Sequence, residues 1–275
     1  MTGAPRSRGF KAVSVSTAPR DLLGGPPRRA GAWTARVITL FPEAFPGVLG
    51  LSLTGRALDA GLWALETVDL RRFGDGRHRN VDDTPAGGGA GMVLRADVLG
   101  RAIEEAQAGV DWPLIALSPR GRPFTQAMAR RLAAGPGATL ICGRFEGIDE
   151  RALQHYRVEE VSLGDFVLTG GEIAAMALID ATVRLIPRVL GNQASVEEES
   201  FARGLLEHPQ YTKPAVWKGR AIPDILLSGH HGRIASWRQA EAERLTQQRR
   251  PDLWRAYRDR LDAPRDTDPD GDREL

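Results

Sequence analysis

Apolar and amphipathic segments alternate along the first two thirds of the chain. Four apolar runs have the length and composition of buried strands, at 35–41, 65–70, 113–117 and 138–142. Apolar residues recur at helical spacing over 97–107, 123–133, 149–155 and 172–186. A helix is also expected between Pro42 and Ala60, with Gly61 as its C-cap. Strands that alternate with helices in this way predict an α/β domain with a largely parallel sheet.

The alternation ends near residue 205. Prolines at 209, 214 and 223 separate short elements there, and a helix is predicted over 230–248. We therefore expect three parts in this order: an α/β domain at 35–190, a flexible linker at 191–204, and a smaller, mainly helical domain at 205–261. Residues 71–92 are polar and rich in glycine, so no regular structure is expected in them.

Both ends of the chain differ in composition from the parts between them. Residues 1–34 carry six basic residues against one acid, Asp21. This is the composition of an organellar transit peptide, and a bacterial extension or a start codon placed too early explains it equally well. We predict a disordered extension there. Residues 262–275 are dense in aspartate and predict a disordered acidic tail.

Composition and charge limit the classes of function. The 275 residues carry a net charge of +2, so no strong overall field attracts polyanions and any basic site must be local. The single cysteine, Cys142, excludes an intrachain disulfide and is expected to pack as a small apolar side chain at a strand end. No apolar run approaches the roughly 20 residues that span a bilayer. These features predict a soluble protein of the reducing cytoplasm, with no membrane contact.

Three loops each follow a predicted strand, at 118–121, 143–147 and 163–171. In an open α/β sheet, ligands bind at the carboxyl ends of strands, so one shared site is expected, although three unrelated tight turns would have the same spacing. The two glycine loops at 143–147 and 163–171 have no known phosphate-binding motif. Glu146 and Asp165 would repel a polyphosphate, so the loops favour a small, neutral or cationic, adenosine-like ligand.

Two further segments carry polar chemistry. Residues 78–92 combine Asp82 and Asp83 with a glycine run, which suits recognition of a base edge, although a solvated loop has the same composition. His78 has no second ligand at metal spacing, and no metal site is predicted. Arginines and tryptophans are interleaved between 233 and 254, which suits RNA, although acids in the same segment are also typical of a solvated helix.

Motifs along most of the chain resemble those of bacterial tRNA (guanine-N1)-methyltransferases, the TrmD-type members of the SPOUT superfamily. The resemblance covers roughly residues 36–261. Besides the loops above, its motifs are Ile38-Thr39-Leu40-Phe41-Pro42-Glu43, Thr54-Gly55-Arg56-Ala57, Arg77-His78-Arg79-Asn80-Val81-Asp82-Asp83, Gly87-Gly88-Gly89-Ala90-Gly91-Met92, Leu178-Ile179-Asp180, Ile186-Pro187-Arg188-Val189-Leu190-Gly191, Gly204-Leu205-Leu206, Pro209-Gln210-Tyr211-Thr212 and Leu226-Leu227-Ser228-Gly229-His230.

The resemblance implies a reaction, a fold and partners. The enzyme would transfer a methyl group from S-adenosyl-L-methionine to N1 of the guanosine at tRNA position 37, next to the anticodon, when a guanosine precedes it. The α/β domain would contain a SPOUT-type trefoil knot, and a homodimer would form its two active sites at the subunit interface. The helical domain would bind the tRNA anticodon stem-loop. Any Mg²⁺ is expected to be transient or tRNA-borne, because no metal-ligand cluster is visible.

The same resemblance implies the residues of the site. Asp82 and Gly91 are expected to receive the target guanine. The cofactor is expected to contact Leu117, Ser118, Pro119, Gly143, Phe145, Glu146, Gly147, Leu163, Gly164, Asp165, Phe166, Val167, Leu168, Gly170 and Gly171.

The chemistry also requires a base and a cation. Guanine N1 carries a proton that a carboxylate must accept, and the negative charge that then grows toward O6 calls for a cation. The resemblance assigns Arg184 as the cation and places Glu199 where the family has an aspartate. The added methylene puts the reach of Glu199 in question. Without the resemblance, residues 197–199 are a solvated acidic patch and Arg184 is a surface arginine.

Two other functions stay open. A tRNA-binding homologue with impaired catalysis is motivated by the changed residue at 199. A nucleotide-phosphate enzyme on a doubly wound sheet is disfavoured by the missing phosphate motifs.

Overall fold

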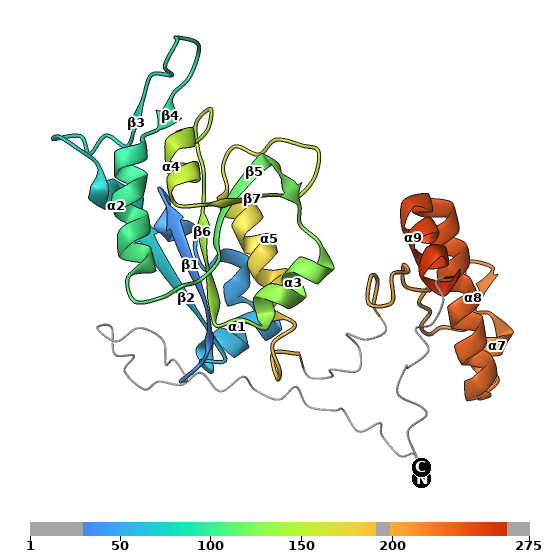
Figure 1. The fold of residues 1–275 in the computed structure, drawn as a ribbon. Coiled ribbons are helices and arrows are strands. Elements are labelled where there is room, and N and C mark those ends of the chain that lie inside the picture. The colour runs from blue at the N-terminus through green and yellow to red at the C-terminus, as the bar shows by residue number, and fades with distance from the viewer. Residues whose placement is uncertain (1–29, 191–198, 263–275) are drawn as a thin grey trace, which may run out of the picture.

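A computed structural model describes residues 30–190 and 199–262. Residues 30–190 are built around a five-stranded sheet, which Figure 1 shows between its helices. The strands are β1 (Trp33–Thr39), β2 (Trp63–Asp69), β5 (Leu114–Pro123), β6 (Gly137–Ile141) and β7 (Glu159–Ser162). Their order is β2-β1-β6-β5-β7, and every neighbouring pair is parallel. The predicted α/β class with a largely parallel sheet is therefore confirmed.

Helices cover both faces of this sheet, as Figure 1 shows. One face packs against α1 (Ser52–Asp59), α3 (Gln126–Ala133) and α5 (Glu172–Val183), and the other against α2 (Ala96–Gln107) and α4 (Glu150–His155). Successive strand residues point to opposite faces, so Val37 belongs to the first core and Ile38 to the second. Each fully buried aliphatic side chain of this size contributes about 1.5–3 kcal/mol. Because strand side chains alternate between the two cores, one sheet binds a layer of helices on each of its faces.

Most predicted element boundaries are close to the observed ones, and the differences follow from capping and proline. The strand expected from Ala35 already begins at Trp33. The helix expected between Pro42 and Ala60 is divided into the 3-10 turns η1 (Pro42–Ala44) and η2 (Gly47–Gly50) and the helix α1, because Pro46 interrupts the segment. Helix α3 begins later than predicted, since the side chain of Thr125 caps it at the nitrogen of Met128.

The prediction that a strand ends at Leu117 and is followed by a loop at 118–121 is wrong. Strand β5 continues to Pro123, and both Leu117 and Arg122 align with Val161 of β7, so the intervening residues form a bulge. Gly121 allows the two backbones to approach, because a Cβ there would lie 2.3 Å from the nitrogen of Val161. The sheet thus keeps its pairing while the bulge pushes 118–121 outward.

The segment 71–92 also differs from the prediction, since it is not wholly irregular. A 3-10 turn, η3 (Leu70–Phe73), begins it. Strands β3 (Asp82–Asp83) and β4 (Val93–Leu94) then pair antiparallel and form a hairpin outside the main sheet. The glycines between them take backbone angles with positive φ, which a tight hairpin end requires.

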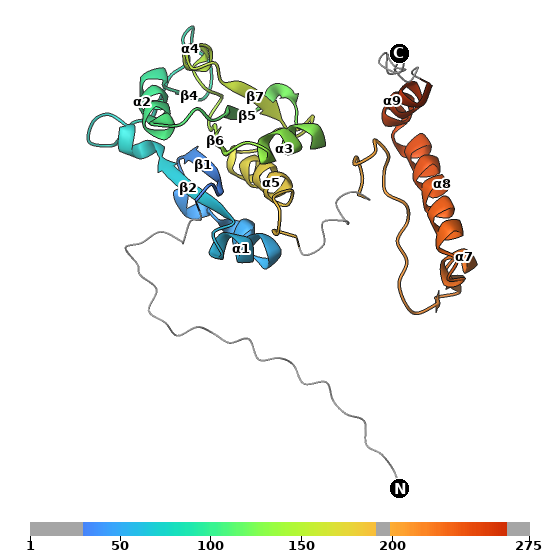
Figure 2. The ribbon, with the colours of Figure 1, turned by 60° about the horizontal axis from the view of Figure 1, so that its bottom comes forward.

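Helices dominate the chain after residue 199. The short strands β8 (Val216–Trp217) and β9 (Arg220–Ala221) form a hairpin, followed by α7 (Asp224–Leu227), α8 (His231–Arg249) and α9 (Pro251–Asp262). Figure 2 shows these three helices in succession. Helix α8 matches the predicted 230–248. The predicted division into domains stays a prediction, because residues 1–29, 191–198 and 263–275 lie outside the described residues. Within the described ranges, no helix combines the length and apolarity needed to cross a bilayer.

Candidate active site

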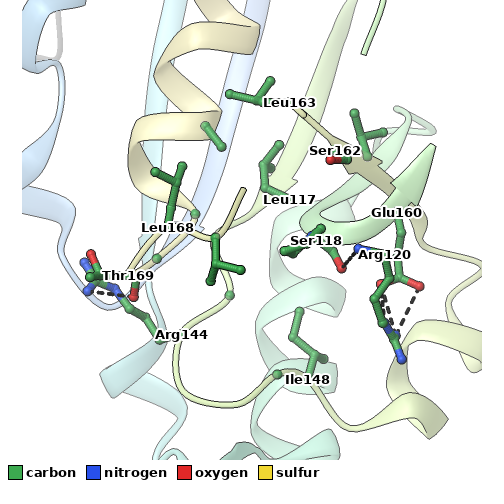
Figure 3. A pocket seen from close by; sticks show the side chains of 18 of the residues that line it. Leu117, Ser118, Arg120, Arg144, Ile148, Glu160, Ser162, Leu163, Leu168 and Thr169 are labelled. Atoms are coloured by element: carbon green, nitrogen blue, oxygen red, sulfur yellow. Dashed lines mark hydrogen bonds and ion pairs between the residues drawn. The ribbon is translucent and has the colours of Figure 1, made fainter. Parts of the chain in front are cut away.

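A cavity of about 460 Å³ lies at the carboxyl ends of β6 and β7 and beside the bulge of β5. This volume falls within the roughly 300–1,000 Å³ of small-molecule sites. Its walls are the loops 143–147 and 163–171, and Figure 3 shows the side chains that surround it. The three segments that the sequence singled out therefore meet at one place. The loops 143–147 and 163–171 do so at strand ends, as expected for a parallel sheet, and 118–121 does so as the bulge of β5.

The structure brings together nearly all predicted cofactor-contacting residues. Those that line the cavity are Leu117, Ser118, Pro119, Gly143, Phe145, Glu146, Gly147, Leu163, Gly164, Phe166, Val167, Leu168, Gly170 and Gly171. Asp165 is exposed and does not line it. Their role in binding a cofactor stays a prediction.

The sequence reasoning missed ten lining residues: Val93, Arg120, Arg144, Ile148, Leu153, Glu160, Val161, Ser162, Thr169 and Ala174. Arg120 was not named as a contact residue, although it belongs to the predicted loop 118–121. The guanidinium of Arg120 contacts Glu150 and Glu160, each at 3.0 Å, and its hydrogen bond to Glu150 lowers the pKa of that carboxyl. Arg144 and Thr169 lie inside the predicted loops, so the glycine spacing already pointed to them. No sequence pattern pointed to Val93, because it reaches the cavity from β4 of the hairpin outside the main sheet.

The two glycine loops are joined by backbone contacts. The nitrogen of Gly171 donates to the carbonyl oxygen of Gly143 at 3.0 Å. Gly171 must be small, since a Cβ there would lie 2.6 Å from the Cα of Cys142. Cys142 itself is fully buried directly after β6, and burial raises the pKa of its thiol well above the usual value. The prediction that Cys142 packs as a buried side chain is confirmed.

The hairpin β3–β4 lies against the first glycine loop. The nitrogen of Glu146 donates to the carbonyl oxygen of Met92 at 2.9 Å, and the nitrogen of Leu94 donates to Gly147 at 3.0 Å. A Cβ on Gly91 would lie 2.4 Å from the side chain of Glu146. Gly91 does not line the cavity, but this contact places it at the cavity's edge.

Asp82 also lies outside the lining, on β3, where it pairs with Leu94. Since Leu94 is hydrogen-bonded to the first glycine loop, Asp82 is one strand away from that loop.

Arg184 and Glu199 form a bidentate ion pair. The two guanidinium nitrogens of Arg184, which caps α5, lie 2.5 and 2.6 Å from the two carboxylate oxygens of Glu199. The hydrogen bonds from Arg184 lower the pKa of the Glu199 carboxyl. Neither residue lines the 460 Å³ cavity of its own chain. Glu197 and Glu198 lie outside the described residues.

Metal binding finds no support in the donor set. Over residues 30–190 and 199–262, no three His, Cys, Asp or Glu side chains are grouped so that they could hold a metal ion. His78 lies in an exposed turn before β3.

A parallel α/β fold whose strand-end loops enclose a cavity of this size defines a class of proteins that bind a small cofactor or substrate at the sheet edge. The sequence model described as tRNA (Guanine-1)-methyltransferase TrmD matches residues 34–256, and the chain belongs to this family. The resemblance inferred from the sequence is therefore confirmed.

Individual relatives agree with the family. A tRNA (guanine-N(1)-)-methyltransferase of Cereibacter sphaeroides strain KD131 is 71% identical over 250 residues, which are 89% of this chain and 99% of that protein. The protein of the same name from Ruegeria sp. strain TM1040 is 72% identical over 85% of this chain and 97% of its own length. A third, from Nitrobacter winogradskyi, is 62% identical over 82% and 94%. The chain spans nearly the whole length of these relatives.

Proposed function

We propose that this chain, a tRNA (guanine-N1)-methyltransferase by family and relatives, uses S-adenosyl-L-methionine to methylate N1 of guanosine 37 in tRNAs with a preceding guanosine. One observation carries the choice of cofactor: the loops after β6 and β7 and the neighbouring bulge of β5 enclose a single cavity of about 460 Å³. The expected cytoplasmic location rests on the tRNA substrate.

The cavity fits this cofactor in size and chemistry. Apolar side chains such as Leu117, Ile148 and Leu168 offer surface to a flat adenine ring, and the glycines let it reach backbone donors and acceptors. The carboxylate of Glu146 would favour a cationic ligand over a polyphosphate. When bound, S-adenosyl-L-methionine supplies an electrophilic methyl group on its sulfonium.

The chain's own residues must handle the proton of guanine N1. We assign its removal to Glu199, which Arg184 keeps ionised and oriented through two hydrogen bonds. Each carboxylate oxygen retains a further lone pair that can accept the proton. Arg184 is also the cation that stabilises negative charge growing at guanine O6. The lowered pKa of Glu199 makes it a weaker base, but it also keeps the carboxylate ionised, and so able to accept a proton, at neutral pH.

A homodimer would join the catalytic pair to a cavity. Arg184 and Glu199 do not line the cavity of their own chain, so a second copy would have to present them to it. An exposed apolar surface supports this proposal: Ile173 and Val167 have 64% and 84% of their surface exposed at the start of α5 and in the loop before it. The turn η2 extends this surface with Val48 and is packed against α5.

We further propose a trefoil knot of the SPOUT type in the sheet. Its support is the strand order, in which the chain runs from β6 on one side of β5 to β7 on the other. No step is derived through Mg²⁺, for which the described residues provide no donor set.

The region after residue 199 carries the basic and aromatic residues that would bind tRNA. Ion pairs within the region show which of its arginines are already engaged. Arg244 and Arg250 are engaged by Glu241 and Asp252, each at 2.6 Å. Arg233 and Arg238 on α8 are exposed and have no ion pair with another described residue. Trp217, 60% exposed, offers a face for base stacking.

Methyl incorporation from labelled cofactor into tRNA transcripts tests the proposal. Transfer to a transcript with both guanosines, and loss of transfer when guanosine 37 is replaced, would support it. Stabilisation of the protein by S-adenosyl-L-methionine without any methyl transfer would instead favour the impaired tRNA-binding homologue, which Glu199 in place of aspartate motivates. Tight ATP binding without response to S-adenosyl-L-methionine would overturn both.

A further inference from the structure

Arg144, one of the residues that line the cavity, connects three segments of the chain. It belongs to the loop 143–147, and its Nη1 donates to the carbonyl oxygen of Thr169 in the loop 163–171 at 3.2 Å. Its Nη2 lies 3.0 Å from Oε2 of Glu172, the first residue of α5. Its guanidinium also stacks over the ring of Phe41, after β1, at 4.4 Å.

Glu172 is in turn anchored to the sheet. Its side chain is only 6% exposed, and its Oε1 accepts a hydrogen bond of 2.8 Å from the hydroxyl of Thr39. Thr39 is fully buried at the end of β1, and its hydroxyl also accepts from the nitrogen of Phe41. Both carboxylate oxygens of Glu172 therefore have partners, as a buried charge requires.

The packing around Arg144 leaves little freedom. A Cβ on Gly170 would lie 2.3 Å from Nε of Arg144, so the loop backbone is pressed against the guanidinium. Nε is buried and has no hydrogen-bond partner among the described residues. A buried donor without an acceptor destabilises the folded state. The contacts that keep the second loop close to the first must offset this free energy.

We propose that Arg144 is a positioning residue for the cofactor, which sets the spacing between the loops 143–147 and 163–171 through Glu172 and Phe41. The inference rests on the proposed function, because it takes the cavity between these loops as the cofactor site. Gly143, Gly170 and Thr169 line that cavity, so a shift of either loop changes its width. Arg144 thereby governs cofactor affinity rather than the proton transfer.

The test compares Arg144→Met with a matched control, Arg36→Met. Arg36 also forms a partly buried pair with a glutamate, Glu66, at 2.6 Å and stacks on Trp112 at 4.8 Å, but it does not line the cavity. Both variants should lower the thermal midpoint. Only Arg144→Met should weaken S-adenosyl-L-methionine binding measured by calorimetry, by about tenfold or more, because only this change releases the contact between the two loops that line the cavity.

Three further measurements separate positioning from general damage. The KM for cofactor should rise in Arg144→Met while the KM for tRNA stays within about twofold of the wild type. Arg144→Lys keeps the charge without the planar fork and should be intermediate. Adding Glu172→Gln to Arg144→Met should cost little more affinity than Arg144→Met alone, because the two side chains act as a unit.

The outcomes are distinguishable. Cofactor affinity in Arg144→Met equal to wild type, or reduced no more than in Arg36→Met, would overturn the positioning role while leaving the proposed function in place. Failure of the wild-type chain to bind S-adenosyl-L-methionine would overturn the proposed function, and the positioning role with it. If Arg144→Met does not fold, the cofactor affinities of Arg144→Lys and Glu172→Gln are compared with that of Arg36→Met in its place.

Discussion

Arg184 holds Glu199 by both carboxylate oxygens, at 2.5 and 2.6 Å, across 15 positions of sequence. The pair joins the end of α5 to the first described residue after the gap at 191–198. Both side chains are about 70% covered, so water screens the pair only in part. The contact lowers the pKa of Glu199, because it favours the ionised carboxylate. In the proposed mechanism, the base and the cation would therefore reach the substrate as one preorganised unit.

Replacing Glu199 with glutamine should remove proton acceptance and keep the shape of the side chain. We expect the single-turnover rate of methyl transfer to fall at least about 100-fold, the usual worth of a positioned general base. Cofactor affinity should be unchanged, because Glu199 does not line the cavity of its own chain and glutamine keeps the size of the side chain that a second copy would present. Full transfer activity in this variant would remove Glu199 from the mechanism.

Replacing Arg184 should change the pH dependence of methyl transfer as well as its rate. The folded-state pKa of Glu199 is depressed, so the pair contributes stability above the unfolded pKa and loses it as pH falls through the folded value. In Arg184→Met the pKa should return toward its ordinary value. The acidic limb of the kcat/KM profile should therefore move to higher pH. An acidic limb at its wild-type position in Arg184→Met would show that another group controls it.

Gly171 tests whether the two loops need their close approach. Its φ of −79° suits alanine, so only the missing space opposes a substitution. A Cβ would lie 2.6 Å from the backbone of Cys142, and Gly171→Ala should destabilise the fold by about 1–3 kcal/mol in urea unfolding.

Gly232 on α8 provides the matched control, because open space surrounds its would-be Cβ. Gly232→Ala should stabilise the helix by about 0.5–1 kcal/mol. Equal effects of the two substitutions would contradict the packing argument.

The thiol of Cys142 should be inert in the folded protein. Burial, with a smaller contribution from Glu172, raises its pKa, so almost no thiolate exists at neutral pH. A thiol reagent should therefore react only after denaturant is added, and the signal is unambiguous because the chain has a single cysteine. Rapid labelling under native conditions would show that the end of β6 opens.

A charge on the apolar surface of α5 tests the proposed dimer. Ile173→Glu should shift sedimentation from dimer to monomer and abolish transfer, while cofactor binding persists in the single chain. Leu261→Glu, on an equally exposed residue of α9, should leave the oligomeric state unchanged. An active wild-type monomer would contradict the proposal.

Local patterns were enough to place most elements and most of the cavity wall. Apolar periodicity located β6 and α2 within one or two residues, because burial on a sheet or helix face leaves a repeating signal. The glycine spacing pointed to the loops that line the cavity. The continuation of β5 past Leu117 was not predicted, since a bulge depends on pairing with β7, which lies far along the chain.

The order of residues by itself determined the α/β class, the loops after β6 and β7, and the family, because periodicity and motifs are patterns of neighbours along the chain. Only the tertiary structure decided which distant groups meet. The contacts between Glu146 and Gly91, between Arg144 and Glu172, and between Arg120 and Glu160 all depend on how separate loops converge at one edge of the sheet. No local pattern encodes such contacts, because their geometry is fixed by the packing of the whole domain.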